Sequence, residues 1–211
     1  DRERRIENIS LLVAFKLIPP ALYALASSPE LRVDAFLAPA HVSSVIGANA
    51  YQPVVERFRL PCVVAGFEPL DILYGVQGIL KQLLAGDAFV ENQYSRAVRA
   101  DGNRKIQALM DKYLEPVDTT WRGLGVLHWS GLALRDSFEG FDSEKRHDVK
   151  IRPGRENPAC RCGDVLKGIV RPTECRLFGK ACTPRNPVGA CMVSAEGTCA
   201  AFYKYSGASL L

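Results

Sequence analysis

The stretch Cys62-Val-Val-Ala-Gly-Phe-Glu-Pro-Leu-Asp-Ile-Leu73 decides the fold. Residues 62–65 are all apolar and have the length of a strand that is buried on both faces, and Gly66 follows them. Pro69 suits the first turn of a helix, and apolar residues then recur at helical spacing as far as Leu84. A buried strand followed at once by a long helix is typical of a parallel α/β sheet.

The same alternation extends on both sides of this stretch. Apolar runs predict further strands at residues 9–15, 33–37 and 125–129, and periodicity predicts helices at residues 19–26, 42–47, 51–59, 69–84 and 103–114. Residues 136–149 are polar and predict surface loop and short helix. We therefore expect an α/β domain over residues 1–150, a parallel sheet flanked by helices. The turn-rich residues 152–158 predict a boundary, followed by a small loop-rich and helical module over residues 151–211.

Composition excludes several classes of protein. Of the 211 residues, 47% are hydrophobic and 24% are charged, which favours a folded chain over a disordered one. No apolar run reaches the roughly 18 residues that a membrane helix needs. The net charge of +4 is spread along the chain without a basic block, which argues against nucleic-acid binding. The charged start at Asp1, without Met or signal peptide, leads us to expect the C-terminal part of a longer, cytoplasmic protein.

Cysteines are concentrated at the end of the chain. Six of the seven lie after residue 159: Cys160, Cys162, Cys175, Cys182, Cys191 and Cys199. Four thiolates complete either a zinc site or an iron–sulfur cluster, so six thiols divide naturally into four plus two. Zinc modules usually pair ligands as C-x-x-C, which this sequence lacks, whereas single cysteines separated by Gly and Pro suit a cluster. A cluster, zinc and free structural thiols all remain open from spacing alone. The seventh, Cys62, is expected to be inert packing in its strand.

The two thiols beyond the four have a role of their own. Cys160 and Cys162 point to the same side if the backbone is extended, so one could bind metal while the other lies beside it. Arg155, Arg161 and Arg176 are close in sequence, and cations favour thiolate. The two leftover thiols could form a redox-active disulfide, or they could simply be small buried residues.

Three cysteine-containing motifs resemble the HypD family of nickel–iron hydrogenase maturation proteins. They are Cys160-Arg-Cys-Gly-Asp-Val-Leu-Lys-Gly168, Pro172-Thr-Glu-Cys-Arg-Leu-Phe-Gly179 and Cys182-Thr-Pro-Arg-Asn-Pro-Val-Gly-Ala-Cys-Met-Val-Ser194. Residues 36–47, 63–73, 90–94, 121–125 and 196–203 resemble it too, so the likeness covers nearly the whole chain. It implies a 4Fe-4S protein that works with HypC-type and HypE-type proteins to assemble the Fe(CN)2CO centre. Such a protein is an assembly scaffold with redox chemistry rather than a turnover enzyme.

The resemblance also implies roles for individual cysteines. Cluster ligands would be Cys162, Cys175, Cys182 and Cys199, with the spacing C-x12-C-x6-C-x16-C. Cys160 and Cys191 would be the disulfide-capable pair, although which of Cys160 and Cys162 is the ligand stays open. Two other functions compete with the scaffold: a ferredoxin-linked thiol–disulfide reductase and a zinc-stabilised interaction module.

Two polar residues follow neighbouring strands. His41 comes after the strand predicted at 33–37, and Glu68 comes after Cys62–Ala65. Ligands of parallel sheets bind beyond the carboxyl ends of the strands, so both could face one crevice and act in proton transfer or iron binding. Structural explanations compete, because an acid such as Glu68 or Asp71 is favourable at a helix N-terminus and His41 could be an ordinary loop residue. His128 and His147 lie outside the motifs and are expected to be structural or at the surface.

Overall fold

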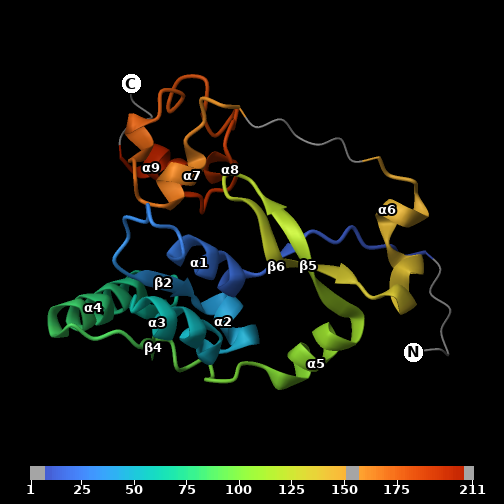
Figure 1. The fold of residues 1–211 in the computed structure, drawn as a ribbon, viewed down its shortest axis with the longest axis horizontal. Helices are drawn as coiled ribbons and strands as arrows, with labels where there is room; N and C mark the ends of the chain where they lie inside the picture. Colours follow the sequence, from blue (N-terminus) through green and yellow to red (C-terminus); the bar gives the residue numbers. More distant parts are fainter. Residues whose placement is uncertain (1–7, 151–156, 207–211) are drawn as a thin grey trace.

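The computed structural model describes residues 8–150 and 157–206 and confirms a parallel sheet at the heart of a mixed α/β fold (Figure 1). The sheet contains β2 (Phe36–Pro39), β3 (Cys62–Ala65) and β4 (Val90–Asn92), with β3 in the middle. All four residues of β3 are at most 3% exposed, because strands pair on both edges and helices cover both faces. The continuous apolar run of β3 is therefore the pattern of a central parallel strand.

Helices precede β2 and connect the parallel strands to one another, as the periodicity predicts. They are α1 (Ile18–Ala26), α2 (Ala40–Ile46), the 3-10 turn η1 (Ala48–Tyr51), α3 (Gln52–Phe58) and α4 (Pro69–Ala85). Tyr51 is completely buried at the centre of the core, where its hydroxyl lies 3.0 Å from the Ser43 hydroxyl. This hydrogen bond satisfies the Tyr51 hydroxyl, which is the polar atom of that buried side chain.

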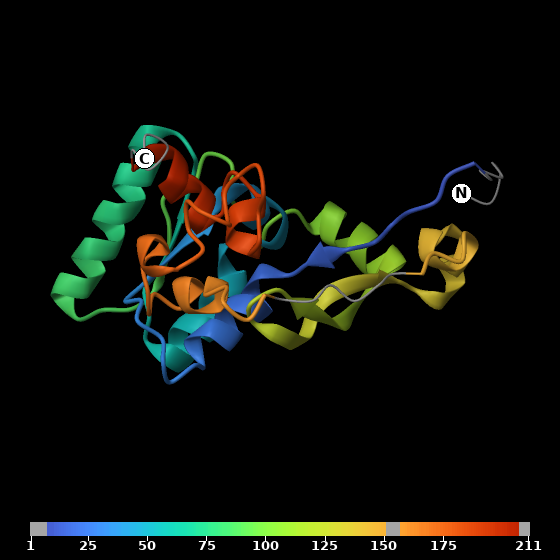
Figure 2. The same ribbon diagram turned by 90° about the horizontal axis from the view of Figure 1, so that it is seen from above.

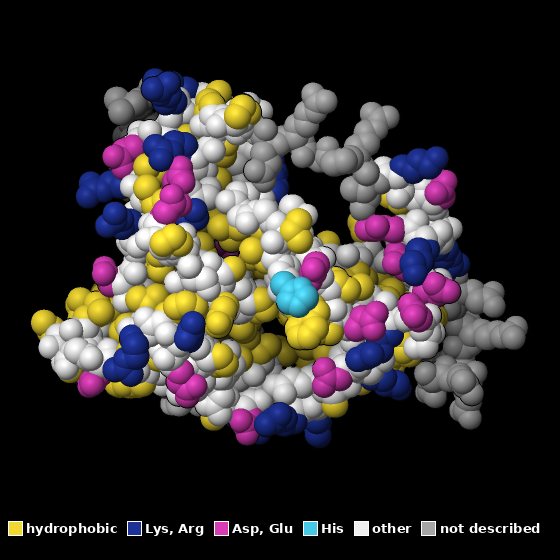
Figure 3. All heavy atoms as spheres, viewed as in Figure 1, with side chains coloured by type: hydrophobic (Ala, Val, Ile, Leu, Met, Phe, Trp, Pro, Cys, Tyr) yellow, Lys and Arg dark blue, Asp and Glu magenta, His cyan; other side chains and the backbone are white. Residues whose placement is uncertain are grey.

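Helix α4 packs on the sheet through its glycines rather than its leucines. A Cβ on Gly75 would lie 2.7 Å from Leu37 Cδ1 and 2.9 Å from the Ala65 Cβ, so the helix and the sheet are in close contact there. Leu73 is 64% exposed and Leu84 is 88% exposed, and Figure 3 shows hydrophobic side chains over this helix. The periodic apolar residues therefore do not mark the face that covers the sheet, because three short strands contact only part of this 17-residue helix and these side chains stay exposed among the described residues.

A second, antiparallel sheet extends away from the parallel one (Figure 2). It contains β1 (Phe15–Lys16), β6 (Gly125–Leu134) and β5 (Leu114–Trp121), in that order. The apolar run predicted that residues 9–15 form a strand of the parallel sheet, and this prediction is wrong. Within that run only Phe15 is in a strand, and it pairs with β6 across from Leu132. Strand β6 is long and has a free edge, and β1 pairs with that edge.

The hairpin is longer than residues 125–129 indicate. Strand β5 carries Pro116 and several polar residues, which hide it in the sequence, but Pro is tolerated because β5 is an edge strand. Before the hairpin, α5 (Arg104–Tyr113) confirms the helix expected at 103–114. After it, η2 (Asp136–Phe141) and α6 (Ser143–Arg146) confirm the predicted short helical segments.

The cysteine module, residues 157–206, consists of short helices joined by loops, as predicted. They are α7 (Cys162–Leu166), the 3-10 turn η3 (Pro172–Glu174), α8 (Ala190–Val193) and α9 (Thr198–Tyr205). Most of the expected boundary at 152–158 lies outside the described residues. The Arg32 amide donates to the Lys167 carbonyl at 2.8 Å, and Lys167 pairs with Glu30, which fixes the module beside α1. No helix in the described ranges has the length and hydropathy needed to span a bilayer.

We predict that Gly75→Val destabilises the protein by roughly 1–3 kcal/mol, because the added methyl groups must displace Leu37 or move α4 away from β3. Urea unfolding of the two proteins measures the difference. Leu84→Ala is the matched control on the same helix: the side chain is 88% exposed, so the change should be small. A Gly75→Val protein as stable as its parent would show that α4 does not need this close approach.

Candidate functional site

The thiols of the module form its hydrophobic core. Cys162, Cys182, Cys191 and Cys199 are each 5–7% exposed and pack with Val165, Met192 and Ala200. Cys160 contacts the same cluster from its edge, and Cys175 is also half-buried. Six cysteines separated by up to 39 positions in sequence therefore belong to one small module, all of them as free thiols.

Cys191 lies at the centre of the thiol contacts. Its backbone N–H donates to Cys162 Sγ at 3.3 Å, and its own thiol donates to Cys199 Sγ at 3.0 Å. Contact with the Cys191 thiol, followed by burial, raises the pKa of Cys162. The Cys162 thiol lowers the pKa of Cys191, but the Cys199 thiol and burial outweigh it and raise that pKa to about 12. These buried sulfurs are therefore protonated in the arrangement described.

Cys160 packs against the same core and lines a pocket together with Cys162. Burial is the main cause that raises the pKa of Cys160, and the charges of Cys162, Cys175 and Cys182 raise it further. Gly189 approaches it closely, since a Cβ there would lie 2.5 Å from Cys160 Sγ. Only glycine leaves room for this sulfur against the loop before α8, which gives Gly189 a packing role beside the thiols.

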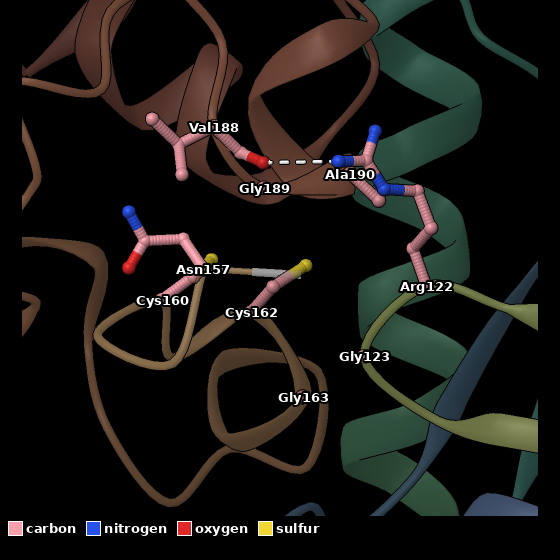
Figure 4. A pocket seen from close by; sticks show the side chains of 9 residues that line it. All are labelled: Arg122, Gly123, Asn157, Cys160, Cys162, Gly163, Val188, Gly189 and Ala190. Carbon is pink, nitrogen blue, oxygen red and sulfur yellow. Dashed lines mark hydrogen bonds between the residues drawn. The ribbon is translucent and has the colours of Figure 1, made fainter. Parts of the chain in front are cut away.

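A small pocket opens where the β5–β6 turn meets the cysteine module. Its volume is about 30 Å³, room for one or two water molecules, and its lining combines Arg122 and Gly123 from the turn with Cys160, Cys162 and Gly189. Figure 4 shows Arg122 reaching across it to Val188, and its guanidinium donates to the Val188 carbonyl at 3.2 Å. Of the arginines expected near the thiols, Arg161 is instead bound to Asp164 at 2.7 Å, and Arg155 lies outside the described residues.

The donor set fits an iron–sulfur cluster by its chemistry. Thiolates are the usual ligands of such clusters, and the module holds four buried thiols in one core and two half-buried ones, Cys160 and Cys175. Among residues 8–150 and 157–206, no group of three or more His, Cys, Asp or Glu is arranged to hold a single metal ion. The described thiols instead contact one another, and metal binding would require the ligands to lose their protons.

The other predicted residues meet at the carboxyl edge of the parallel sheet. Pro39 of β2 lies opposite Ala65 of β3, so the segments after both strands emerge side by side. The His41 ring lies 5.2 Å from the ring of Phe67, the residue just before Glu68. His41 and Glu68 therefore share this edge, as predicted, but both are exposed there.

An arginine connects Glu68 to a buried acid. Arg96 donates to both carboxylate oxygens of Asp71 at 2.8 and 2.6 Å, lies 3.5 Å from Glu68 and stacks 3.8 Å above the Tyr94 ring. The Arg96 guanidinium lowers the pKa of Asp71 to about 2. Gly66 makes room for this group, because a Cβ would lie 2.3 Å from the Tyr94 ring. Asp71 is thus one half of an ion pair rather than only a favourable acid at a helix start.

We predict that Asp71→Asn destabilises the protein at about pH 7 and that the difference from the parent shrinks on acidification. A lowered pKa in the folded state stabilises that state above the carboxyl's ordinary pKa of about 3.9, and this contribution is lost as the pH falls towards about 2. Thermal unfolding at about pH 7 and about pH 3 tests this. Glu68→Gln is the control: its exposed contact with Arg96 should contribute little. An unchanged difference at both pH values would contradict the ion-pair explanation.

Several residues were not singled out as site residues from sequence, although all of them except Arg96 lie in stretches that carry the family resemblance. Arg122, Gly123 and Gly189 border the thiols, and Tyr94 and Arg96 hold the sheet edge. The glycines of the β5–β6 turn were a usable signal, because Gly123 and Gly125 both have positive φ. The expected histidines outside the motifs are at the surface: His128 pairs with Asp118 and His147 contacts Ser10. Cys62 is 1% exposed in β3, as expected for packing.

Fold and site together define a thiol-rich α/β protein, in which a parallel sheet supports a module whose core is made of cysteines. A family model named HypD and described as "Hydrogenase formation hypA family" matches residues 1–206. The hydrogenase maturation factors HypD of Cupriavidus necator, Azotobacter vinelandii and Escherichia coli are 43%, 46% and 42% identical over 97%, 95% and 97% of this chain. The chain belongs to the HypD family of hydrogenase maturation factors. It spans about half the length of these curated relatives, from 54% to 56%.

Proposed function

We propose that this chain carries the iron–sulfur part of a hydrogenase maturation scaffold, with four thiols that hold a 4Fe-4S cluster and two that form a switchable pair. The observation that carries the proposal is the gathering of four buried cysteines into one core, with the half-buried Cys160 packed against it and Cys175 in the same small module. Burial in a small module provides protected thiolate ligands, and the spare thiols lie next to them. When bound, such a cluster supplies or accepts single electrons.

Contacts of the thiols support one division of their roles. The Cys191 backbone N–H donates to Cys162 Sγ at 3.3 Å, and its thiol also interacts with Cys162, whereas no hydrogen bond joins Cys160 to Cys191 among the described residues. We therefore assign Cys162 and Cys191 to the switchable pair. The ligands are then Cys160, Cys175, Cys182 and Cys199. The motif resemblance assigns Cys160 to the pair and Cys162 to the cluster, and experiment can distinguish the two assignments.

The ligand assignment predicts the iron content of single variants. After anaerobic cluster loading, Cys160→Ser, Cys175→Ser, Cys182→Ser and Cys199→Ser should each lose most of the iron, whereas Cys162→Ser should keep it. Iron analysis and the visible absorption of the cluster are the measurements, and Cys62→Ala is the control because its thiol lies in β3. Normal iron in Cys160→Ser with loss in Cys162→Ser would restore the assignment from the motifs. Zinc without iron in the parent would favour the zinc-stabilised module.

The switchable pair predicts a specific disulfide. Mild oxidation of the loaded protein should join Cys162 to Cys191 and leave the iron in place, because the Cys191 backbone N–H already lies 3.3 Å from Cys162 Sγ and neither thiol holds the cluster. Mass spectrometry of alkylated peptides identifies the partner of Cys191, and Cys191→Ala should abolish the bridge. A bridge from Cys191 to Cys160 or to Cys199 would contradict the pair, and loss of iron on oxidation would show that a ligand had been consumed.

The partners and the setting complete the proposal. HypC-type and HypE-type proteins would work with the full-length scaffold to assemble the Fe(CN)2CO centre, in a reducing compartment such as the cytoplasm. There a disulfide is transient, which suits a pair that switches. His41 and Glu68, side by side at an exposed sheet edge, are the residues that we propose face this chemistry in proton transfer or iron binding.

A ferredoxin-linked thiol–disulfide reductase is the second candidate, favoured by the contact of Cys191 with two other thiols. The two functions differ in turnover. A reductase reduces many equivalents of a protein disulfide per chain when electrons are supplied, whereas a scaffold transfers its iron group once per cycle. Disulfide reduction counted per chain, with Cys191→Ala as the control, distinguishes them.

A further inference from the structure

Arg122 is a charged group of the thiol pocket that the proposed function does not use. It lines the pocket with Cys160 and Cys162 but comes from the β5–β6 turn, far away in sequence. Its guanidinium donates to the Val188 carbonyl, and it forms no ion pair with any residue of the described ranges. A cation that is held by a backbone carbonyl keeps its full charge for a molecule that arrives from outside.

Two cations of the module itself are paired with acids. Arg161 is bound to Asp164 at 2.7 Å, and Lys167 is bound to Glu30 at 2.9 Å. The module as a whole is nevertheless basic: residues 157–206 contain seven Lys or Arg and three Asp or Glu. Figure 3 shows several Lys and Arg side chains at the surface of the module, at the upper left of the view. Both the local charge at Arg122 and the wider field therefore favour an anion.

The size of the pocket restricts what can reach the sulfurs. A volume of about 30 Å³ admits only the tip of a molecule, and the pocket walls are mostly backbone and small side chains: Gly123, Gly163, Gly189 and Ala190. A narrow group such as a sulfur with its methylene could approach Cys160 and Cys162 from outside, while the charged end of the same molecule stayed at the rim beside Arg122.

We infer that Arg122 makes this pocket selective for small carboxylate-bearing thiols and disulfides, which exchange with the Cys162–Cys191 pair. The inference rests on the proposed function for the identity of the pair. Arg122 acts as a specificity-determining residue because its charge attracts the carboxylate and its position directs the sulfur towards Cys162.

The exchange balances as an ordinary thiol–disulfide reaction. Cys162 first loses its proton and then attacks one sulfur of the external disulfide, so that a mixed disulfide forms and one external thiolate leaves. Cys191 then attacks Cys162 Sγ, which closes the internal disulfide and releases the second external thiolate. Each leaving thiolate takes up one of the two protons that Cys162 and Cys191 lose. Two electrons pass from the pair to the external disulfide, and the reverse sequence returns them.

Three small disulfides of different charge test the inference on this chain: dithiodipropionate (anionic), hydroxyethyl disulfide (neutral) and cystamine (cationic). Mass spectrometry locates the modified cysteine and gives the rates for the parent, Arg122→Gln, Arg122→Lys and the control Arg185→Gln, a module arginine that does not line the pocket. In the parent we expect the anionic reagent to modify the pocket thiols fastest. Arg122→Gln should lower the anionic-to-cationic rate ratio roughly threefold to tenfold, while Arg122→Lys and Arg185→Gln should nearly keep it.

Added salt gives a second readout, because it should reduce the anionic preference of the parent and leave Arg122→Gln unchanged. Equal acceleration of all three reagents in Arg122→Gln would mean that Arg122 only closes the pocket, and this would overturn the inference. Pocket thiols that no reagent modifies would overturn it as well. A preference that depends on Arg122 but ends in a mixed disulfide, without a Cys162–Cys191 bridge, would support the charge selectivity and refute the proposed pair instead.

Discussion

Burial of β3 on both faces is the constraint on which the rest of the fold depends. The four side chains of β3 are all apolar and buried. Because its backbone N–H and C=O groups are buried too, they must form hydrogen bonds on both edges of the strand. β2 and β4 satisfy the edges, and α4 covers one face so closely that Gly75 meets Leu37 and Ala65. The same pairing sets the segments after β2 and β3 beside each other, which brings His41 to Phe67 and Glu68.

The cysteine module is stabilised differently from the α/β part of the chain. About fifty residues with short helices offer few aliphatic side chains, and domains of this size usually depend on disulfides or metals. Here the thiols themselves fill the core with Val165, Met192 and Ala200. Under the proposed function, a metal cluster held by four of them would also link the loops of the module. Packing and ligation would then use the same atoms.

The β5–β6 hairpin connects the module to the sheet. Gly163 comes so near the turn that a Cβ would lie 2.3 Å from the Gly123 carbonyl oxygen, a distance that only a backbone without side chains permits. Beside that contact Arg122 reaches the Val188 carbonyl. Lys16 of β1 donates to the Thr120 carbonyl in the same hairpin, so the turn is held from the sheet side as well. The hairpin thus places a charge at the thiols without belonging to their module.

Sequence by itself determined the central strand, the helices after it, the loop-rich cysteine module and the family, because buried strands, helix starts and cysteine motifs are local patterns. It also placed His41 and Glu68 on one edge, since strand ends follow from strand order. Tertiary structure decided the rest. Residues 9–15 are apolar, yet β6 supplies the partner of Phe15. The leucines of α4 are periodic, yet Gly75 and Gly78 face the sheet because the strands are short. Which thiols touch Cys191, and that Arg122 lies beside them, depends on contacts between segments far apart in the chain, and no local pattern records such contacts.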